Sequence, residues 1–125
     1  MNNYPLINSQ LGIYFYQINN TQSCVYNNPF CINISKNDNV DIFKLANDFK
    51  ALVNNHKVFS VAIDVIEGIP SMILDQHNFE YQLCKVDEDD IQNQLEKFVK
   101  PFDLKNDTLV RLTIFETQNN FYFAF

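Results

Sequence analysis

Two histidines are the side chains best suited to proton transfer here, because an unperturbed imidazole titrates close to neutral pH. His56 lies at the end of an apolar stripe with helical spacing, and no motif places a serine, cysteine or carboxylate beside it. We therefore interpret His56 as a structural histidine. His77 lies between Gln76 and Asn78 in a polar stretch, where a solvated loop position is expected. Neither histidine is assigned a catalytic role.

The acidic run at residues 87–90 lacks the spaced oxygen ligands and the turn glycine of a calcium loop, and capping of the following helix explains it. Arg111, the only arginine, falls in a strand-like run, where a structural ion pair with a carboxylate is expected. Gly12 and Gly68 are the only glycines, which excludes a glycine-rich phosphate loop, and no Gly-x-Ser-x-Gly elbow occurs. We therefore predict no catalytic, cofactor-binding or metal-ligating residue in this chain.

Three cysteines, Cys24, Cys31 and Cys84, accompany an N-terminus with neither a basic nor an apolar leader region. We expect reduced, structural thiols in a cytoplasmic protein. The gap between Cys24 and Cys31 does not fit a zinc knuckle, since no close Cys/His pair joins them.

The charge balance excludes several partners. The formal net charge is −6, with 9 Lys and Arg against 15 Asp and Glu, so there is no basic cluster to neutralise nucleic-acid phosphates. The same deficit argues against an anionic membrane surface, and no apolar run is long enough to span a bilayer. We expect neither nucleic acid nor membrane as a partner.

Three stretches carry apolar residues at helical spacing: residues 8–18, 40–56 and 88–100. Each has polar residues that can cap its first turn: Asn8 for the first, Asp38 or Asn39 for the second and Asp87 for the third. Asp90 at the third position of the last stretch suits a capping box, and Pro101 ends that helix.

Six stretches are predicted to be strands: residues 25–34, 58–66, 71–75, 80–86, 109–116 and 121–125. Residues 67–70 supply the turn of one hairpin, and Asn119 and Asn120 supply that of another. The last strand is apolar without alternation, as expected for a central strand covered on both faces. The predicted fold is α/β, an α+β two-layer sandwich in which about three helices pack a mixed sheet, with residues 1–125 as a single unit.

Four local motifs, in this order and at this spacing, resemble the N-terminal lobe of condensation domains from nonribosomal peptide synthetases, which have a chloramphenicol acetyltransferase-like fold. The motifs are residues 4–14 with Gln10 and Tyr14, residues 25–30, residues 52–59 with His56, and residues 101–104 followed by 109–111. The chain departs from the family pattern at Ile7, which is usually Ser or Thr. It also departs at Asn55 and Ser60, which are usually Arg, and at Lys57, which is usually acidic.

The resemblance implies that a His-His-x-x-x-Asp-Gly motif follows the strand at residues 121–125, and that this chain is truncated before it. The second histidine of that motif assists attack of an acceptor amine on a donor thioester, either as a base or by positioning the amine. Donor and acceptor ride on phosphopantetheine arms of carrier-protein domains, and the tunnel needs a C-terminal lobe.

The parent is therefore expected to be an enzyme that forms amide bonds, and this fragment alone is expected to bind no cofactor and to be inactive. Its expected partners are carrier-protein domains and the missing lobe, and the isolated fragment is expected to self-associate. Two alternatives stay open: a lobe of a related acyltransferase, epimerisation or cyclisation domain, or a non-enzymatic α/β binding module.

Overall fold

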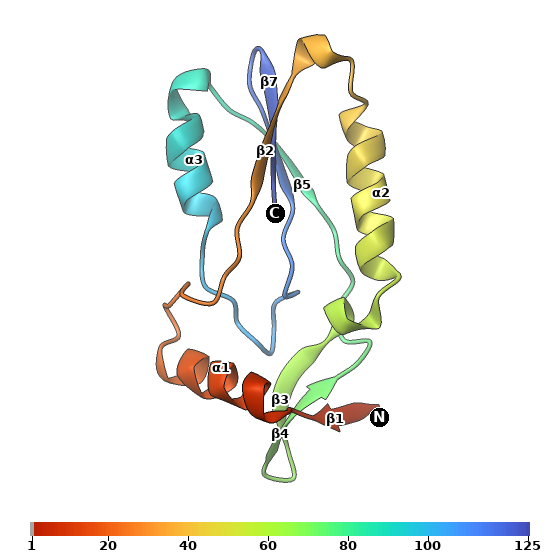
Figure 1. The fold of residues 1–125 in the computed structure, drawn as a ribbon, viewed down its shortest axis with the longest axis vertical. Coiled ribbons are helices and arrows are strands. Elements are labelled where there is room, and N and C mark those ends of the chain that lie inside the picture. The colour runs from red at the N-terminus through yellow and green to blue at the C-terminus, as the bar shows by residue number, and fades with distance from the viewer. Residues whose placement is uncertain (1) are drawn as a thin grey trace.

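The computed structural model describes residues 2–125, which form three α-helices, seven strands and three short 3₁₀ helices (Figure 1). In chain order the elements are β1 (Asn3–Pro5), α1 (Asn8–Asn19), β2 (Cys31–Ser35), η1 (Lys36–Asp38), α2 (Ile42–Asn54), η2 (Lys57–Ser60), β3 (Ala62–Ile66), β4 (Ile69–Ile73), β5 (Gln82–Lys85), η3 (Glu88–Asp90), α3 (Ile91–Phe98), β6 (Thr113–Glu116) and β7 (Asn120–Ala124). The predicted α/β class with a mixed sheet and three helices is confirmed, but the strands form two sheets.

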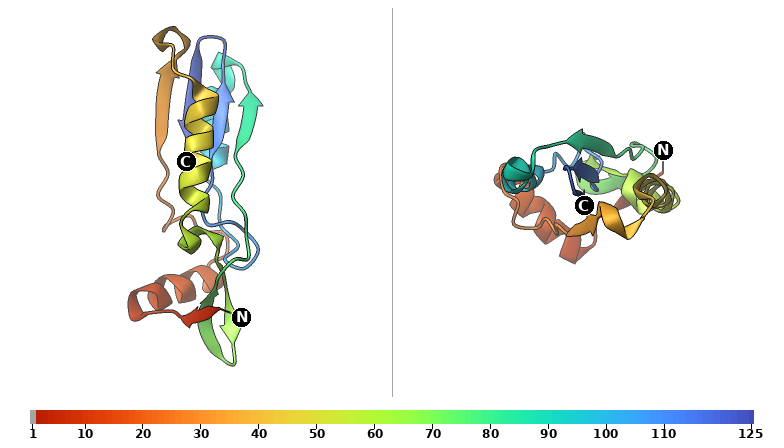
Figure 2. Two further views of the ribbon diagram at one scale, coloured as in Figure 1. Left: turned by 90° about the vertical axis from the view of Figure 1, so that its right-hand side faces the viewer. Right: turned by 90° about the horizontal axis from the view of Figure 1, so that it is seen from above.

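The larger sheet has the strand order β2-β7-β6-β5, and it is mixed because β5 runs parallel to β6 while the other pairs are antiparallel. Figures 1 and 2 show α2 and α3 on opposite faces of this sheet. The central position predicted for the last strand is confirmed, because β7 lies between β2 and β6. A central strand covered on both faces needs no polar alternation, which explains its apolar run.

The core lies between α2 and the larger sheet. Its buried members come from α2, the loop before β5, the residue before β6, and strands β6 and β7: Ile42, Ala46, Val53, Phe79, Leu112, Ile114 and Phe123. The ring of Phe49 on α2 lies within 5.7 Å of the rings of Phe79, Phe123 and Phe125, measured between centroids. On the other face, Phe98 of α3 contacts Phe115 edge-on at 6.3 Å. The apolar spacing of both helices therefore serves to cover the two faces of one sheet.

The smaller sheet has the order β1-β4-β3 and is antiparallel throughout. The prediction that residues 67–70 form its hairpin turn was wrong by two residues. Only Glu67 and Gly68 turn, both with positive φ (51° and 83°), and such two-residue turns match the twist of paired strands. Pro70 instead pairs with Val65 inside β4, where its carbonyl accepts from Leu6 N–H at 3.0 Å. Its missing N–H faces the end of the short β1 ladder, so no strand hydrogen bond is lost.

The caps expected for the helices were wrong. The first helix starts at Asn8 itself, after Ile7, whose N–H donates to Gln10 Oε1 at 3.0 Å. The second is capped by Asp41, which accepts from Lys44 N–H at 3.0 Å, and not by Asp38 or Asn39, because those two lie in η1 and its end.

The acidic start of the third helix also differs from the expected capping box. Asp87 makes no side-chain cap bond, and residues 88–90 form η3 before α3 begins. The Asp90 carboxylate accepts from the side chains of Asn93 and Gln94 rather than from a backbone N–H. Glu88 accepts from Asn119 N–H, and hydrogen bonding from Thr117 is the main cause that lowers the pKa of Glu88. Two carboxylates of the acidic run at residues 87–90, those of Glu88 and Asp90, therefore accept hydrogen bonds near the start of α3.

Four predicted strands begin later than expected. Those predicted at residues 58–66 and 80–86 begin at Ala62, after η2, and at Gln82. Residues 25–29 turn away from the sheet, and Asn27 Nδ2 donates to the Lys100 carbonyl at 3.0 Å, so this segment packs against the end of α3. Regular strand β2 begins only at Cys31, although Phe30 still exchanges two backbone hydrogen bonds with Phe125. β6 likewise begins at Thr113, although the Leu112 carbonyl still accepts from Gln82 N–H at 3.0 Å.

Candidate functional site

An apolar pocket of about 350 Å³ lies at the C-terminal end of β7, between the larger sheet and α1. Its walls come from α1, the segment before β2, the segment after α3 and the residues before β6. Its lining residues are Ile13, Gln17, Tyr26, Asn27, Asn28, Pro29, Phe30, Phe98, Val99, Phe102, Leu104, Leu109, Val110, Arg111 and Phe125. The stacked rings of Phe30 and Phe125, 5.5 Å apart, close one side. We call this the β7 pocket.

The polar groups of the β7 pocket come from Gln17, Tyr26, Asn27, Asn28 and Arg111. Gln17 on α1 is buried, and its Nε2 donates to the Ser23 carbonyl at 3.2 Å. Arg111 reaches the pocket from the residues before β6. Among the residues that line it, none is a histidine, cysteine, serine or carboxylate. The β7 pocket can therefore bind apolar groups and offer hydrogen bonds, and Tyr26 carries the only hydroxyl among its lining residues.

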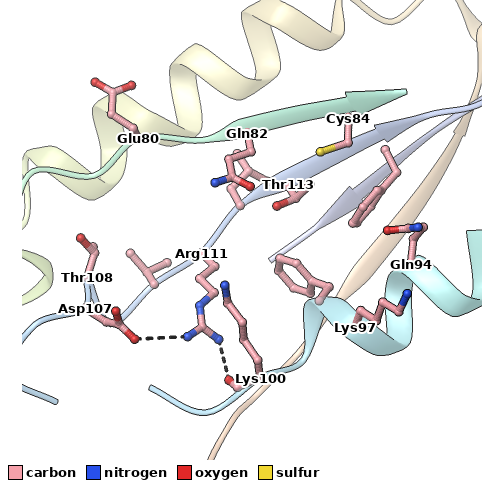
Figure 3. Close-up of a pocket in the computed structure, with 14 residues that line it drawn as sticks. Glu80, Gln82, Cys84, Gln94, Lys97, Lys100, Asp107, Thr108, Arg111 and Thr113 are labelled. Carbon is pink, nitrogen blue, oxygen red and sulfur yellow. Dashed lines mark hydrogen bonds and ion pairs between the residues drawn. The ribbon is translucent and has the colours of Figure 1, made fainter. Parts of the chain in front are cut away.

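A second pocket of about 390 Å³ lies on the other side of the residue 98–111 segment, between α3 and strands β5 and β6 (Figure 3). Gln82 and Cys84 line it from β5, and Gln94 and Lys97 line it from α3. Both charge signs are present in this polar pocket, which shares Phe98, Val110 and Arg111 with the β7 pocket.

Arg111 is held by four groups. Its Nη1 donates to the Lys100 carbonyl at 2.6 Å, and its Nη2 donates to the Pro101 carbonyl at 2.7 Å and lies 3.5 Å from Asp107 Oδ2. Its guanidinium carbon lies 3.7 Å from the centroid of the Phe102 ring. The predicted structural ion pair of Arg111 is confirmed, and partial burial lowers the pKa of its guanidinium while Asp107 raises it.

A compact turn at residues 103–107 supports this arrangement. The Asp103 carboxylate accepts from the backbone N–H groups of Lys105 and Asn106 at 3.0 and 3.1 Å, and from Asn106 Nδ2 at 3.0 Å. In return, Asp107 Oδ2 accepts from Asp103 N–H at 2.9 Å. The Asn106 side chain is the main cause that lowers the pKa of Asp103, since these bonds favour its charged form.

Replacing Asp103 by asparagine is expected to lower the midpoint of urea unfolding at about pH 7, and much less at about pH 2.5. A depressed folded pKa contributes stability above the unfolded pKa of about 3.9, and this stability is lost as the pH falls through the folded pKa. The loss should stay below about 1 kcal/mol, because this carboxylate is solvent-exposed.

Asp89→Asn is the matched control, since the exposed Asp89 side chain makes no hydrogen bond among the described residues, and it should leave both midpoints unchanged. An Asp103→Asn protein with the wild-type midpoint at neutral pH would contradict the role given to this turn.

The structure does not bring the two histidines together in a site. The interpretation of His56 as part of the apolar stripe was wrong, because α2 ends at Asn54 and His56 is exposed beyond it. His77 is half-buried rather than solvated, with Nε2 3.1 Å from the Lys105 carbonyl.

The three cysteines are free thiols among the described residues. Cys31 is exposed at the start of edge strand β2, and partial burial raises the pKa of its thiol. Residues 2–125 contain no group of three His, Cys, Asp or Glu side chains that could hold a metal ion. Within the same residues, every helix is too short or too polar to cross a membrane.

Sequence reasoning missed two residues of this region. Asp107 stands four residues before Arg111, a spacing that could have indicated the ion pair. Gln17 stands three residues after Tyr14, and both are the buried members of α1. The apolar stripe predicted for that helix was wrong, since Phe15 and Ile18 are 49% and 44% exposed.

Comparison with known proteins gives one family over the whole chain. The family model for the Condensation domain matches residues 1–125. Bacitracin synthase 2 of Bacillus licheniformis is 27% identical over 112 residues, which are 89% of this chain and 4% of that protein. The chain spans only 2–4% of the length of the curated relatives it matches.

Solved structures show the same fold. The condensation domain of the Monacolin K polyketide synthase matches with a TM-score of 0.75 at 15% identity, over 100% of this chain and 30% of that chain. The first condensation domain of the CDA synthetase matches with a TM-score of 0.76 at 13% identity, over 98% of this chain and 34% of that chain. The described elements therefore correspond to about a third of each of these chains.

Proposed function

This chain belongs to the Condensation domain family, and on that premise we propose that it is the N-terminal lobe of a condensation domain in a nonribosomal peptide synthetase. The observation that carries the proposal is the match of the family over residues 1–125, together with relatives that are peptide synthases. The parent protein would form amide bonds between aminoacyl or peptidyl thioesters. These thioesters arrive on phosphopantetheine arms of carrier-protein domains, so the cofactor belongs to the substrate rather than to this chain.

The β7 pocket supports this proposal through its place in the fold. β7 is the strand after which the family's His-His-x-x-x-Asp-Gly motif is expected, and Phe125 at its end lines the pocket. Histidines that follow Phe125 would enter a region whose walls are mostly apolar and whose lining holds no other histidine and no carboxylate. The lobe would thus supply walls and hydrogen bonds, and residues outside this chain would supply the proton transfer.

The test is the gene sequence beyond residue 125. We expect a His-His-x-x-x-Asp-Gly motif within about ten residues of Phe125, since a short loop suffices to carry the motif back over the pocket. Its absence would count heavily against the proposal. Adenylation and carrier domains further along the same gene would favour a synthetase, whereas a lone two-lobed protein would favour a freestanding acyltransferase.

The isolated chain is expected to self-associate, because α1 leaves apolar side chains uncovered. Ile7, just before the helix, is 63% exposed, and Phe15 and Ile18 are also exposed. The weight-average mass in analytical sedimentation should therefore rise with concentration. The double variant Phe15→Glu with Ile18→Glu should reduce this rise.

Leu52→Glu on α2, at a residue that is also exposed, is the matched control for this surface and should leave the association unchanged. A wild-type chain that sediments as a monomer at every concentration would contradict the prediction.

A further inference from the structure

Arg111 joins parts of the chain that no regular element connects. It binds the carbonyls of Lys100 and Pro101 just after α3, the ring of Phe102, and Asp107 in the following turn. Its side chain is 18% exposed, so these contacts replace most of its hydration. Figure 3 shows the guanidinium between Asp107 and Lys100 at the edge of the polar pocket.

The segment that Arg111 holds also binds the smaller sheet. Ile63 N–H of β3 donates to the Leu104 carbonyl at 2.8 Å, and Lys105 Nζ lies 2.7 Å from Asp64 Oδ2. Arg111 therefore binds both ends of residues 99–107, and the middle of this segment contacts β3. This segment is the structural link that Arg111 tightens between the two sheets.

The same segment separates the two pockets. Val99, Phe102 and Leu104 line the β7 pocket, and Lys100 and Asp107 line the polar pocket. A lysine would not reproduce these contacts, because its single nitrogen lacks the two-nitrogen fork that binds the carbonyls of Lys100 and Pro101 beside the Phe102 ring. The geometry therefore requires an arginine at this position.

We propose that Arg111 is a positioning residue that fixes residues 99–107 as the common wall of both pockets and as the link between the two sheets. Arg111 acts through the segment that it holds and does not itself touch the reacting atoms. Its effect on substrate binding rests on the proposed function, whereas its effect on the segment does not.

Hydrogen exchange on the 125-residue chain tests the proposal directly. In Arg111→Lys, the hydrogen-bonded amides of residues 103 and 105–107 should exchange about ten-fold faster or more, because local opening no longer breaks two charge-assisted hydrogen bonds. The amides of α2 and β7 should keep their wild-type rates within about two-fold. None of the four groups that hold Arg111 belongs to either of these elements. Phe102→Leu removes the ring beside the guanidinium but keeps both carbonyl hydrogen bonds of Arg111, and it should give a smaller change in the same segment.

Lys36→Ala is the matched control for the loss of a paired cation. Lys36 also makes an ion pair, with Glu116 at 3.3 Å, and lies 5.1 Å from the ring of Phe121, but it lines neither pocket. It should leave the exchange of residues 99–107 unchanged. Wild-type protection of this segment in Arg111→Lys would overturn the proposal, and so would faster exchange that is equal across the whole chain.

A second measurement uses the longer protein that contains the complete condensation domain. Arg111→Lys should raise KM for the thioester substrate about ten-fold while kcat changes less than about two-fold, since the altered wall binds substrate without joining the chemistry. An unchanged KM would overturn the effect on the pocket. A wild-type domain without turnover would refute the proposed function instead, and the exchange result would still decide the role of Arg111.

Discussion

Residues 1–125 alone are expected to give no amide product from carrier proteins loaded with donor and acceptor, whereas the complete condensation domain should turn over. The lining of the β7 pocket holds no histidine, carboxylate, serine or cysteine to accept the amine proton. General acid–base catalysis contributes about 10²–10⁴-fold, and loss of substrate positioning by a second lobe adds to that deficit. The rate should thus fall by at least about 10³-fold, below detection by mass spectrometry of the product on its carrier.

The matched control is the complete domain in which the second histidine of the expected motif is replaced by alanine. It keeps both lobes and the carrier contacts, so it separates the loss of proton transfer from the loss of the tunnel. Turnover by the 125-residue chain would contradict the prediction that its catalytic groups lie beyond Phe125. Turnover by the complete domain is required for the proposed function.

Phe123→Ala is expected to destabilise the chain by about 3–5 kcal/mol, measured as the free energy of unfolding in urea. Phe123 is 3% exposed on central strand β7, and its ring contacts those of Phe49 and Phe125. Removing the ring deletes buried contacts with α2 and leaves a cavity that the sheet cannot close. Since small domains have about 5–15 kcal/mol in total, a large share of the unfolding free energy should be lost.

Phe43→Ala on α2 is the control for this substitution, because it removes the same ring from a side chain that is 53% exposed. It should cost less than about 1 kcal/mol, since surface substitutions away from special contacts have small effects. Similar losses for the two variants would contradict the location of the core between α2 and β7.

The pattern of apolar residues correctly predicted the elements that build this core. The spacing in residues 40–56 and 88–100 predicted the helices that became α2 and α3, and the apolar run of residues 121–125 predicted a central strand. These signals are local because one helix face or one buried strand repeats its own environment along the chain. The quoted motifs likewise identified the family, which the comparison confirmed over residues 1–125.

The ends of the elements depended on partners distant in sequence. Residues 25–29 were predicted to begin a strand, but this segment turns away from the sheet, and Asn27 donates to the Lys100 carbonyl 73 positions away. His56 continued the helical spacing, yet α2 ends two residues earlier and the side chain is exposed. A local sequence pattern cannot show which distant residues a segment contacts in the folded chain.

Apolar periodicity and charge were enough to predict the α/β class, the helices that cover the larger sheet, and an anionic partner for Arg111. Three features became visible in the folded chain alone: the division of the strands into two sheets, the two carbonyls that Arg111 binds as well as Asp107, and the β7 pocket beside Phe125. Periodicity and charge indicate which environment each residue needs, such as a buried face or a partner of opposite charge. Which groups meet those requirements depends on how segments far apart in the chain pack together.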